Sequence, residues 1–220
     1  ENDFSDPATL WDFTQYRMQW EIRDGGLYLT EEPAAGAGKI NLATDFGFIL
    51  YNGGTNLSNY VIDVDLMNAR TQSGVIFRSQ QNLVKHKNSA FCGYISHVSH
   101  TVTQGVIGAG STKGEWAGNL SAGSNHKSLH PGANIHINVI VKDQKVGVKM
   151  TNIDDGKLVF DKVYTIGSNS QYDAIYTEGT FGLRMKAKYN DSVAAGVSYF
   201  DNLVVTTANE AVPAVTPIDT

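Results

Sequence analysis

The sequence predicts an antiparallel all-β domain, and three observations indicate this fold class. Apolar and polar residues alternate in short runs, the pattern of half-buried strands whose successive side chains point to opposite faces. Turn-forming residues are frequent, since 22 glycines are spread through the chain together with many Asn and Ser residues. No segment shows the 3.6-residue apolar period of an amphipathic helix, so strands joined by turns are expected throughout.

The clearest strand is Tyr60–Met67, in which the apolar residues at even positions would face the core. Asp63 and Asp65 occupy odd positions of this segment and would point away from the core. Residues 74–78 follow after a polar turn, so these two segments are expected to form a hairpin.

Further strands are expected along the rest of the chain. Residues 142–145 are a polar turn between two apolar runs, which predicts a second hairpin. Gly, Ser, Asn and Lys dominate residues 110–134, so this stretch is expected to be largely loop. The remaining strands are expected at 4–13, 20–29, 91–98, 105–108, 135–141, 146–150, 158–164, 179–189 and 197–205.

The length of the chain is compatible with one domain. All-β sandwiches often reach 220 residues as a single unit, and we expect one such unit over residues 1–207. Residues 208–220 contain prolines and no apolar periodicity, which is typical of a C-terminal tail or linker.

Charge and hydropathy exclude two classes of partner and suggest a location. The net charge of -5 argues against nucleic acid, whose binders carry a basic surface that neutralises phosphates. No run approaches the roughly 20 apolar residues of a membrane-spanning helix. The sequence does not begin with Met, so we expect a processed chain that is secreted, periplasmic or at the cell surface.

Four phrases of the sequence carry a resemblance to a known superfamily. They are WEIRDGGL at residues 20–27, YVIDVDL at 60–66, SGVIFR at 73–78, and GTFGLR at 179–184 together with FDNLVV at 200–205. In this order, over residues 3–206, they resemble the concanavalin A-like lectin and glucanase superfamily, and in particular bacterial laminin G-like domains. The resemblance implies a two-sheet antiparallel jelly-roll sandwich whose first and last strands lie close together and whose concave sheet holds the ligand.

The resemblance also implies a carbohydrate partner, either a polysaccharide or an oligosaccharide. The superfamily contains lectins, non-catalytic carbohydrate-binding modules, laminarinase-type glycoside hydrolases and the keto-disaccharide hydrolase family. Members of this last family usually continue their glycine and arginine strand into a Tyr-Glu-x-Gln phrase, which does not follow Arg78. A fold does not choose between these functions, because function depends on the residues of the site.

Asp63 and Asp65 are the candidates for catalysis. Retaining glycoside hydrolysis needs two carboxyl groups about 5 Å apart, and the Glu-x-Asp-x-x-Glu pattern of laminarinase-type enzymes is absent. The two aspartates share a strand face at a backbone separation of roughly 6.5 to 7 Å, and could act as nucleophile and general acid. The alternative is an ordinary pair of solvent-facing acids.

Arg78 and Arg184 are the candidates for ligand binding. Both have the parity of a sheet face turned away from the core, and the planar guanidinium suits paired hydroxyls or a carboxylate. Lys186 has the same parity as Arg184, and Asp63 and Asp65 could share this face. A cross-strand ladder of charges that only supports the sheet is the alternative.

Trp116 and Asp201 complete the candidate residues. Trp116 stands in the polar stretch and could provide a stacking platform for a sugar ring, although Trp is also common in cores. The resemblance implies a structural calcium ion between the first and last strands, and Asp201 in the phrase Phe200-Asp201-Asn202 would be its ligand. The alternative is an aspartate at a turn or sheet edge.

These observations favour a carbohydrate-binding domain that acts in extracellular glycan recognition or degradation. The alternative is a glycoside hydrolase that uses Asp63 and Asp65. A protein-interaction domain of the laminin G type is a third possibility, which the lack of a large exposed apolar run disfavours. The oligomeric state is left open.

Overall fold

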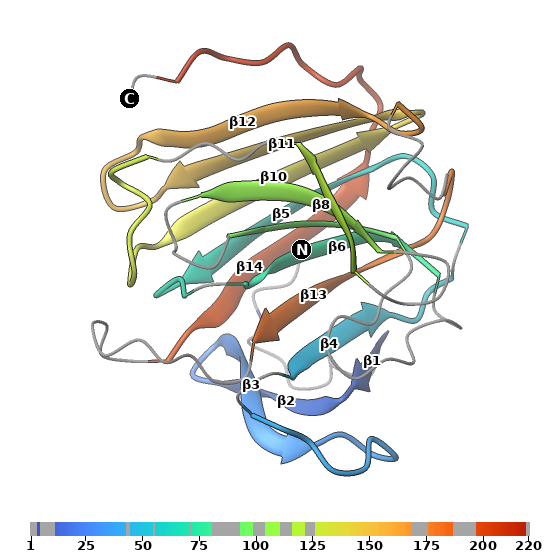
Figure 1. Ribbon diagram of the computed structural model, residues 1–220, viewed down its shortest axis with the longest axis vertical. Coiled ribbons are helices and arrows are strands. Elements are labelled where there is room, and N and C mark those ends of the chain that lie inside the picture. The colour runs from blue at the N-terminus through green and yellow to red at the C-terminus, as the bar shows by residue number, and fades with distance from the viewer. Residues whose placement is uncertain are drawn as a thin grey trace.

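In the part of the chain that it describes, the computed structural model contains two antiparallel sheets of seven strands each (Figure 1). The first sheet has the order β1-β4-β13-β6-β7-β8-β9, and the second has the order β12-β11-β10-β5-β14-β3-β2. The structure describes residues 4, 12–42, 45–54, 56–70, 72–80, 93–98, 104–110, 116–121, 126–168, 176–186 and 197–218. No α-helix occurs among these residues, and so none that could span a membrane.

The strand bounds are as follows. The first sheet consists of β1 (Phe13–Tyr16), β4 (Phe46–Tyr51), β13 (Thr180–Lys186), β6 (Gly74–Ser79), β7 (Tyr94–Val98), β8 (Gly105–Gly110) and β9 (Trp116–Ser121). The second consists of β12 (Leu158–Thr165), β11 (Lys145–Asn152), β10 (Ile135–Lys142), β5 (Tyr60–Met67), β14 (Tyr199–Thr207), β3 (Gly26–Pro33) and β2 (Met18–Arg23).

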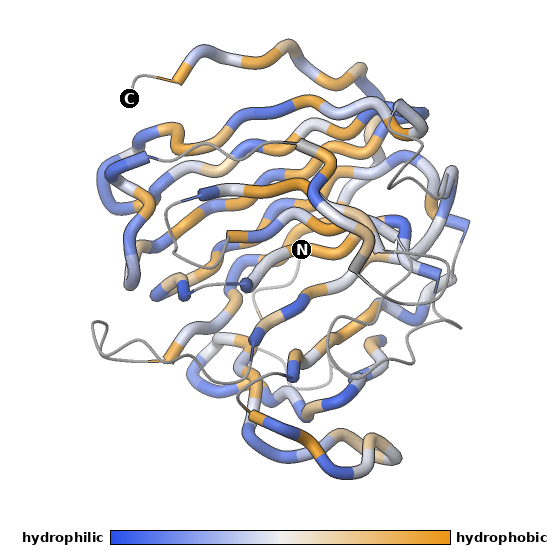
Figure 2. Tube along the Cα trace, viewed as in Figure 1, coloured by the Kyte–Doolittle hydropathy of each residue, from blue (hydrophilic) through white to orange (hydrophobic). Residues whose placement is uncertain are grey.

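The hydrophobic core lies between the two sheets. Along β5 and β10 buried and half-buried residues alternate strictly, because every second side chain points inward. Ile62, Val64 and Leu66 of β5 and their neighbours on β10 are fully buried in this core. The same alternation is visible along the strands of the second sheet in Figure 2. The predicted inward face of β5 is therefore confirmed.

The connection between β5 and β6 differs from the prediction. These segments were expected to pair as a hairpin, but β5 pairs with β10 and β14, whereas β6 pairs with β13 and β7. The chain crosses from one sheet to the other between them, so their apolar faces pack across the core instead of sharing backbone hydrogen bonds. The second predicted hairpin is confirmed, since β10 and β11 pair with Lys142 opposite Lys145.

Two further strands depart from the expectations. Residues 110–134 are not all loop, because β9 pairs with β8 within this stretch. The strand β4 was not predicted, and both of its faces are buried. A strand covered on both sides shows a continuous apolar run without alternation, which periodicity does not distinguish from other buried segments.

The outer face of the first sheet carries a second apolar cluster. Phe46, Phe48 and Leu50 of β4 pack there with Ile76 and Ile95. All five side chains are buried, and they point away from the main core between the sheets. The outer face of the second sheet is different, because the polar residues of β5, β10 and β14 lie on it.

The described part of the C-terminal tail packs against the second sheet. The Thr216 backbone N–H donates to Asp161 Oδ2 at 2.8 Å, and Lys142 Nζ donates to the Ala208 carbonyl at 3.0 Å. The Val212 side chain lies against Gly147 of β11. Residues 208–217 therefore run along the outer side of β10 to β12, past β12 in Figure 1. The domain boundary at residue 207 remains a prediction.

Candidate functional site

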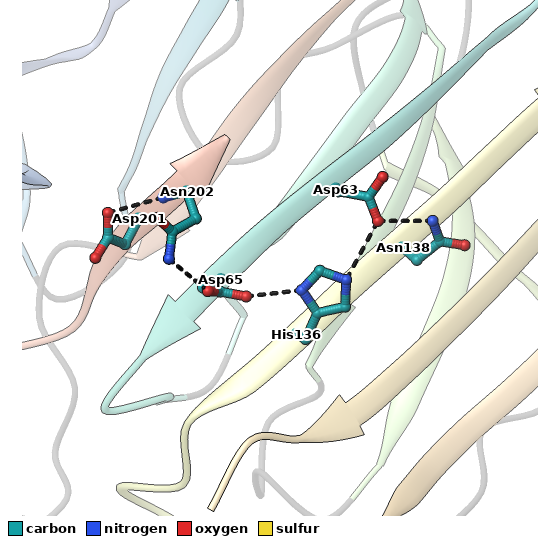
Figure 3. A network of polar contacts seen from close by, with 6 residues as sticks. All are labelled: Asp63, Asp65, His136, Asn138, Asp201 and Asn202. Carbon is teal, nitrogen blue, oxygen red and sulfur yellow. Dashed lines mark hydrogen bonds and ion pairs between the residues drawn. The ribbon is translucent and has the colours of Figure 1, made fainter. Parts of the chain in front are cut away.

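A polar cluster lies on the outer face of the second sheet, where β10, β5 and β14 run side by side (Figure 3). The inward positions of β5 are apolar, so Asp63 and Asp65 point outward as predicted. The register of β10 places His136 opposite Asp65 and Asn138 opposite Asp63. We call Asp63, Asp65, His136, Asn138 and Asn202 the histidine cluster.

One imidazole joins the two carboxylates. His136 Nδ1 lies 2.7 Å from Asp65 Oδ1, and Nε2 lies 3.2 Å from Asp63 Oδ1. Both ring nitrogens can donate only when the histidine is protonated, so this geometry favours the imidazolium. The side chain of His136 is 40% exposed and that of Asp65 is 17% exposed, so the cluster is open to solvent on one side.

Two asparagine amides also donate to the carboxylates. Asn138 Nδ2 donates to Asp63 Oδ1 at 2.8 Å, and Asn202 Nδ2 donates to Asp65 Oδ2 at 2.8 Å. Asn202 reaches this position because β14 has a β-bulge between Asp201 and Val204. Asn202 is left-handed there, with φ of 51°, so Asp201 and Asn202 both lie on the outer face while Leu203 enters the core.

The contacts within the cluster shift the pKa of its histidine and those of its aspartates in opposite directions. Hydrogen bonds to Asp63 and Asp65 raise the pKa of His136 to about 9. The hydrogen bond from His136 lowers the pKa of Asp63. Burial acts to raise the pKa of Asp65, but hydrogen bonds from His136 and Asn202 outweigh it and the pKa is lowered. At neutral pH the cluster therefore consists of an imidazolium between two ionised carboxylates.

An aromatic pair lies on the same face of the sheet. Tyr28 of β3 and Tyr199 of β14 stack with ring centroids 4.7 Å apart and an interplanar angle of 23°. The Arg23 guanidinium lies 4.2 Å from the Tyr28 ring centroid. Tyr199 is two residues before Asp201 on one strand, a distance of about 7 Å along the sheet. This tyrosine pair thus neighbours the end of the histidine cluster formed by Asp65 and Asn202.

Arg184 and Lys186 lie on the opposite side of the molecule. Their strand, β13, belongs to the first sheet, and its alternate residues Leu183 and Met185 enter the core. Since β5 also turns its apolar residues inward, Asp65 and Arg184 point outward on opposite faces of the sandwich. The expectation that the aspartates share a face with the predicted ligand-binding cations is wrong.

Arg184 is buried on the outer face of the first sheet, with 4% of its surface exposed. Its guanidinium lies 3.7 Å from the Phe46 ring centroid, and Nη1 is 3.4 Å from His97 Nδ1. Burial lowers the pKa of Arg184 to about 9. Lys186, two residues along the strand, is half-buried. Arg184 thus places a cation over the apolar ring of Phe46.

Arg78 does not lie on an exposed sheet face, and that prediction is wrong. It is 1% exposed, and its guanidinium donates to the carbonyls of Ser58, Tyr176 and Asp143 at 2.8, 3.2 and 2.5 Å. Its backbone has φ of 49°, at the point where the register between β6 and β13 shifts, and its N–H donates to Tyr60 Oη at 2.7 Å. Arg78 therefore joins three segments at one end of the sandwich.

One family model matches most of the chain. Residues 4–206 match the model of the 3-keto-alpha-glucoside-1,2-lyase-like domain, a range that includes all strands except the last residue of β14. The chain belongs to this family. The lack of a Tyr-Glu-x-Gln phrase after Arg78 thus does not exclude membership. Among curated proteins, none is significantly similar to this chain.

Solved structures share the fold of this chain. The carbohydrate binding module CBM66 from Bacillus subtilis is 14% identical, with 89% of this chain and 96% of that chain covered and a TM-score of 0.54. A legume lectin-like domain from Entamoeba histolytica is 7% identical, with coverage of 94% and 95% and a TM-score of 0.62. The exoplasmic/lumenal domain of VIP36 in a Ca²⁺/Man3GlcNAc-bound form is 11% identical, with coverage of 96% and 89% and a TM-score of 0.55.

These likenesses establish the architecture. At such low identities they show the fold alone, and together with the two seven-stranded antiparallel sheets they confirm the predicted concanavalin A-like jelly-roll sandwich. The resemblance implied that the first and last strands lie close together, but these two strands do not pair: β1 is at the edge of the first sheet, whereas β14 lies between β5 and β3 in the second.

The calcium site at Asp201 remains a prediction. Asp201 Oδ1 accepts a hydrogen bond from the Asn202 N–H at 2.8 Å. Within the described ranges, no group of three or more His, Cys, Asp or Glu side chains could hold a metal ion.

Trp116 begins β9, but its side chain lies outside the described part of the structure. Its role as a stacking platform therefore remains a prediction.

Several residues of the site were not predicted from the sequence. His136, Asn138 and the tyrosine pair were not named, and Asn202 was named only as part of the phrase that contains Asp201. The signal that could have found His136 and Asn138 is the alternation within residues 135–141, which places both on the outer face. Which strand would face them was not readable, because β5 lies about 70 residues earlier in the chain.

Proposed function

We propose that this domain binds a saccharide on the outer face of the second sheet. The observation that supports this is the position of the histidine cluster beside the tyrosine pair. A sugar offers pairs of hydroxyls and an apolar ring face, and sites that bind it combine fixed polar groups with aromatic side chains. The carboxylates and amides of the cluster are held in place by their own hydrogen bonds, which reduces the entropy lost on binding.

The family supports a specific class of sugar. Its description names a 3-keto-alpha-glucoside, so we propose that the ligand is a glucoside or a 3-keto derivative of one. Sugar binding by structural neighbours, such as the Man3GlcNAc-bound form of VIP36, supports a saccharide in general. That neighbour is an exoplasmic or lumenal domain, which supports our proposal that this domain acts outside the cytoplasm.

A second candidate function is elimination from a 3-keto-α-glucoside. The observation that favours it is the presence of an acid and a base in one cluster, namely the His136 imidazolium and ionised Asp63 or Asp65. A carboxylate would accept the proton from C2, the C1–O bond would break as a C1=C2 double bond forms, and His136 would protonate the leaving oxygen. Separated pKa values are typical of such acid and base pairs, although ion pairs also produce them.

Hydrolysis by Asp63 and Asp65 alone is less well supported. A retaining mechanism needs one carboxyl group that is protonated and a substrate between the two. Here both pKa values are lowered, and the imidazole of His136 stands between the carboxylates. The elimination is therefore the better enzymatic candidate.

The binding proposal is tested by titrating methyl α-glucoside and its 3-keto derivative into the protein and following two-dimensional NMR spectra. Tyr199→Ala should weaken binding about threefold to tenfold by removing an aromatic surface. Lys186→Ala, on the opposite sheet, is the matched control and should leave affinity unchanged. If Lys186→Ala weakens binding and Tyr199→Ala does not, the sugar binds the first sheet and the proposed face is wrong.

The enzymatic candidate is tested by incubating the protein with the 3-keto glucoside and recording the ultraviolet absorbance of the conjugated enone product. His136→Gln should abolish turnover but retain much of the binding, because glutamine can still donate one hydrogen bond. Binding without any absorbance change in the wild-type protein would leave saccharide binding as the function.

A further inference from the structure

A pocket of about 450 Å³ opens between the two sheets, away from the histidine cluster. Its walls come from β1, β4 and β13 of the first sheet and from the end of β14 in the second. The pocket lies beside Tyr60, where β5 begins, whereas His136 pairs near the other end of that strand. The proposed saccharide site does not include this pocket.

Three aromatic rings form the wall on the side of the first sheet. Tyr51 stacks on Phe181 with centroids 4.9 Å apart and an interplanar angle of 15°. Phe13 meets both rings edge-on, at 5.8 Å from Tyr51 and 6.1 Å from Phe181. The facing wall contains Leu203 and Val205 of β14. A pocket between an aromatic and an aliphatic wall suits a flat apolar ring.

One carboxylate lies among the lining residues. Asp12 is exposed, and its side chain makes no hydrogen bond or ion pair with the described part of the chain. Its backbone carbonyl is occupied, because it accepts the Asn52 N–H at 2.7 Å. The described residues that line the pocket include no lysine, arginine or histidine. The charge at this site therefore complements a cation.

We propose that this pocket binds a small aromatic amine. The aromatic ring lies between the rings of Tyr51 and Phe181 and the side chains of Leu203 and Val205, and the ammonium group meets the Asp12 carboxylate. The volume is within the range of about 300 to 1,000 Å³ that small-molecule pockets occupy. This inference is independent of the proposed saccharide binding, because it uses none of the same residues.

The test compares three probes that share a phenyl ring and differ in charge. Phenethylamine, 2-phenylethanol and 3-phenylpropionate are titrated separately into the 220-residue chain, and binding is followed by protein-observed NMR. The amine should bind about twofold to fivefold more tightly than the alcohol, as expected for an exposed ion pair, and the carboxylate should bind most weakly. Asp12→Asn should remove the preference for the amine while the ring still binds.

A pocket-filling variant tests the location. Val205→Trp should abolish binding of all three probes, and Val197→Trp, at an exposed position on another part of the surface, is the matched control. If Val205→Trp does not fold, nuclear Overhauser effects from the phenyl protons to Phe181 and Leu203 in the wild-type protein locate the ring. No binding, equal binding of the three probes, or Overhauser effects to other residues would overturn the proposal.

Discussion

His136 is an electrostatic centre of the outer face of the second sheet. Its imidazolium lies between Asp63 and Asp65, and its pKa is raised to about 9. In the unfolded chain the pKa of histidine is about 6.5, so the stabilisation is complete below that pH and is lost as the pH rises through about 9. The two aspartates have lowered pKa values, so their contribution is present above 3.8 and is lost as the pH falls below it.

We therefore expect His136→Gln to reduce the free energy of unfolding most between pH 3.8 and pH 6.5. The substitution should have little effect well above pH 9. The loss should be about 1 kcal/mol, because the exposed side of the cluster screens the charges. Urea unfolding of both proteins at a series of pH values measures it. A difference that stays constant from neutral to strongly alkaline pH would contradict the assignment of charge to His136.

Arg78 is a structural residue, and its replacement should destabilise the protein. Arg78→Ala leaves three carbonyl acceptors without their donor and empties a buried site, which together should lower the free energy of unfolding by at least about 2 kcal/mol. This loss is larger than the change expected for an exposed arginine. Arg23→Ala, at an exposed position, is the control and should change stability by no more than about 0.5 kcal/mol. Thermal unfolding compares the variants.

Among the elements, β14 depends on its bulge for the shape of the site. Asn202 has φ of 51°, a conformation that glycine and asparagine accept and β-branched residues resist. Asn202→Gly should preserve the bulge and the stability while removing the amide that holds Asp65. Sugar binding should then weaken without a large change in melting temperature.

The matched variant at this position is Asn202→Val. Its branched side chain disfavours the left-handed backbone and should cost about 1 to 2 kcal/mol of stability. Chemical denaturation of both variants separates the backbone effect from the loss of the amide. Equal destabilisation by glycine and valine would show that the amide, not the bulge, sets the stability here.

At the scale of the whole molecule, the C-terminal tail joins the second sheet. Deleting residues 211–220 removes the hydrogen bond from Thr216 to Asp161 and the packing of Val212 on Gly147. The free energy of unfolding should fall by about 1 to 2 kcal/mol. In an Asp161→Ala background the same deletion should cost less, because the two changes remove one shared hydrogen bond. Additive effects would mean that the tail and Asp161 do not interact in solution.

The two outer faces of the sandwich carry different kinds of side chain. The first sheet carries Arg184 above Phe46 and a buried apolar cluster, whereas the second carries the histidine cluster and the tyrosine pair. Of the candidate residues predicted from the sequence, the aspartates are on the face of the second sheet and Arg184 and Lys186 are on that of the first. A ligand that contacts Asp65 therefore does not also reach Arg184 or Lys186.

The alternation of residue types along the sequence was enough to predict an antiparallel all-β fold and the outward direction of Asp63 and Asp65. It succeeded because the side-chain direction in a half-buried strand depends only on parity. It failed for Phe46–Tyr51, which is buried on both faces and has no alternation to read. It failed for Arg78 as well, because a positive φ changes the direction of the chain locally.

Only the tertiary structure decided which outward residues meet. His136 lies between Asp63 and Asp65 because β10 pairs with β5 in one register, and a shift of that register by one residue would separate them. Arg184 and Asp65 are apart because their strands belong to different sheets. Parity is a local property of each strand, whereas sheet order and register depend on contacts between segments far apart in the chain.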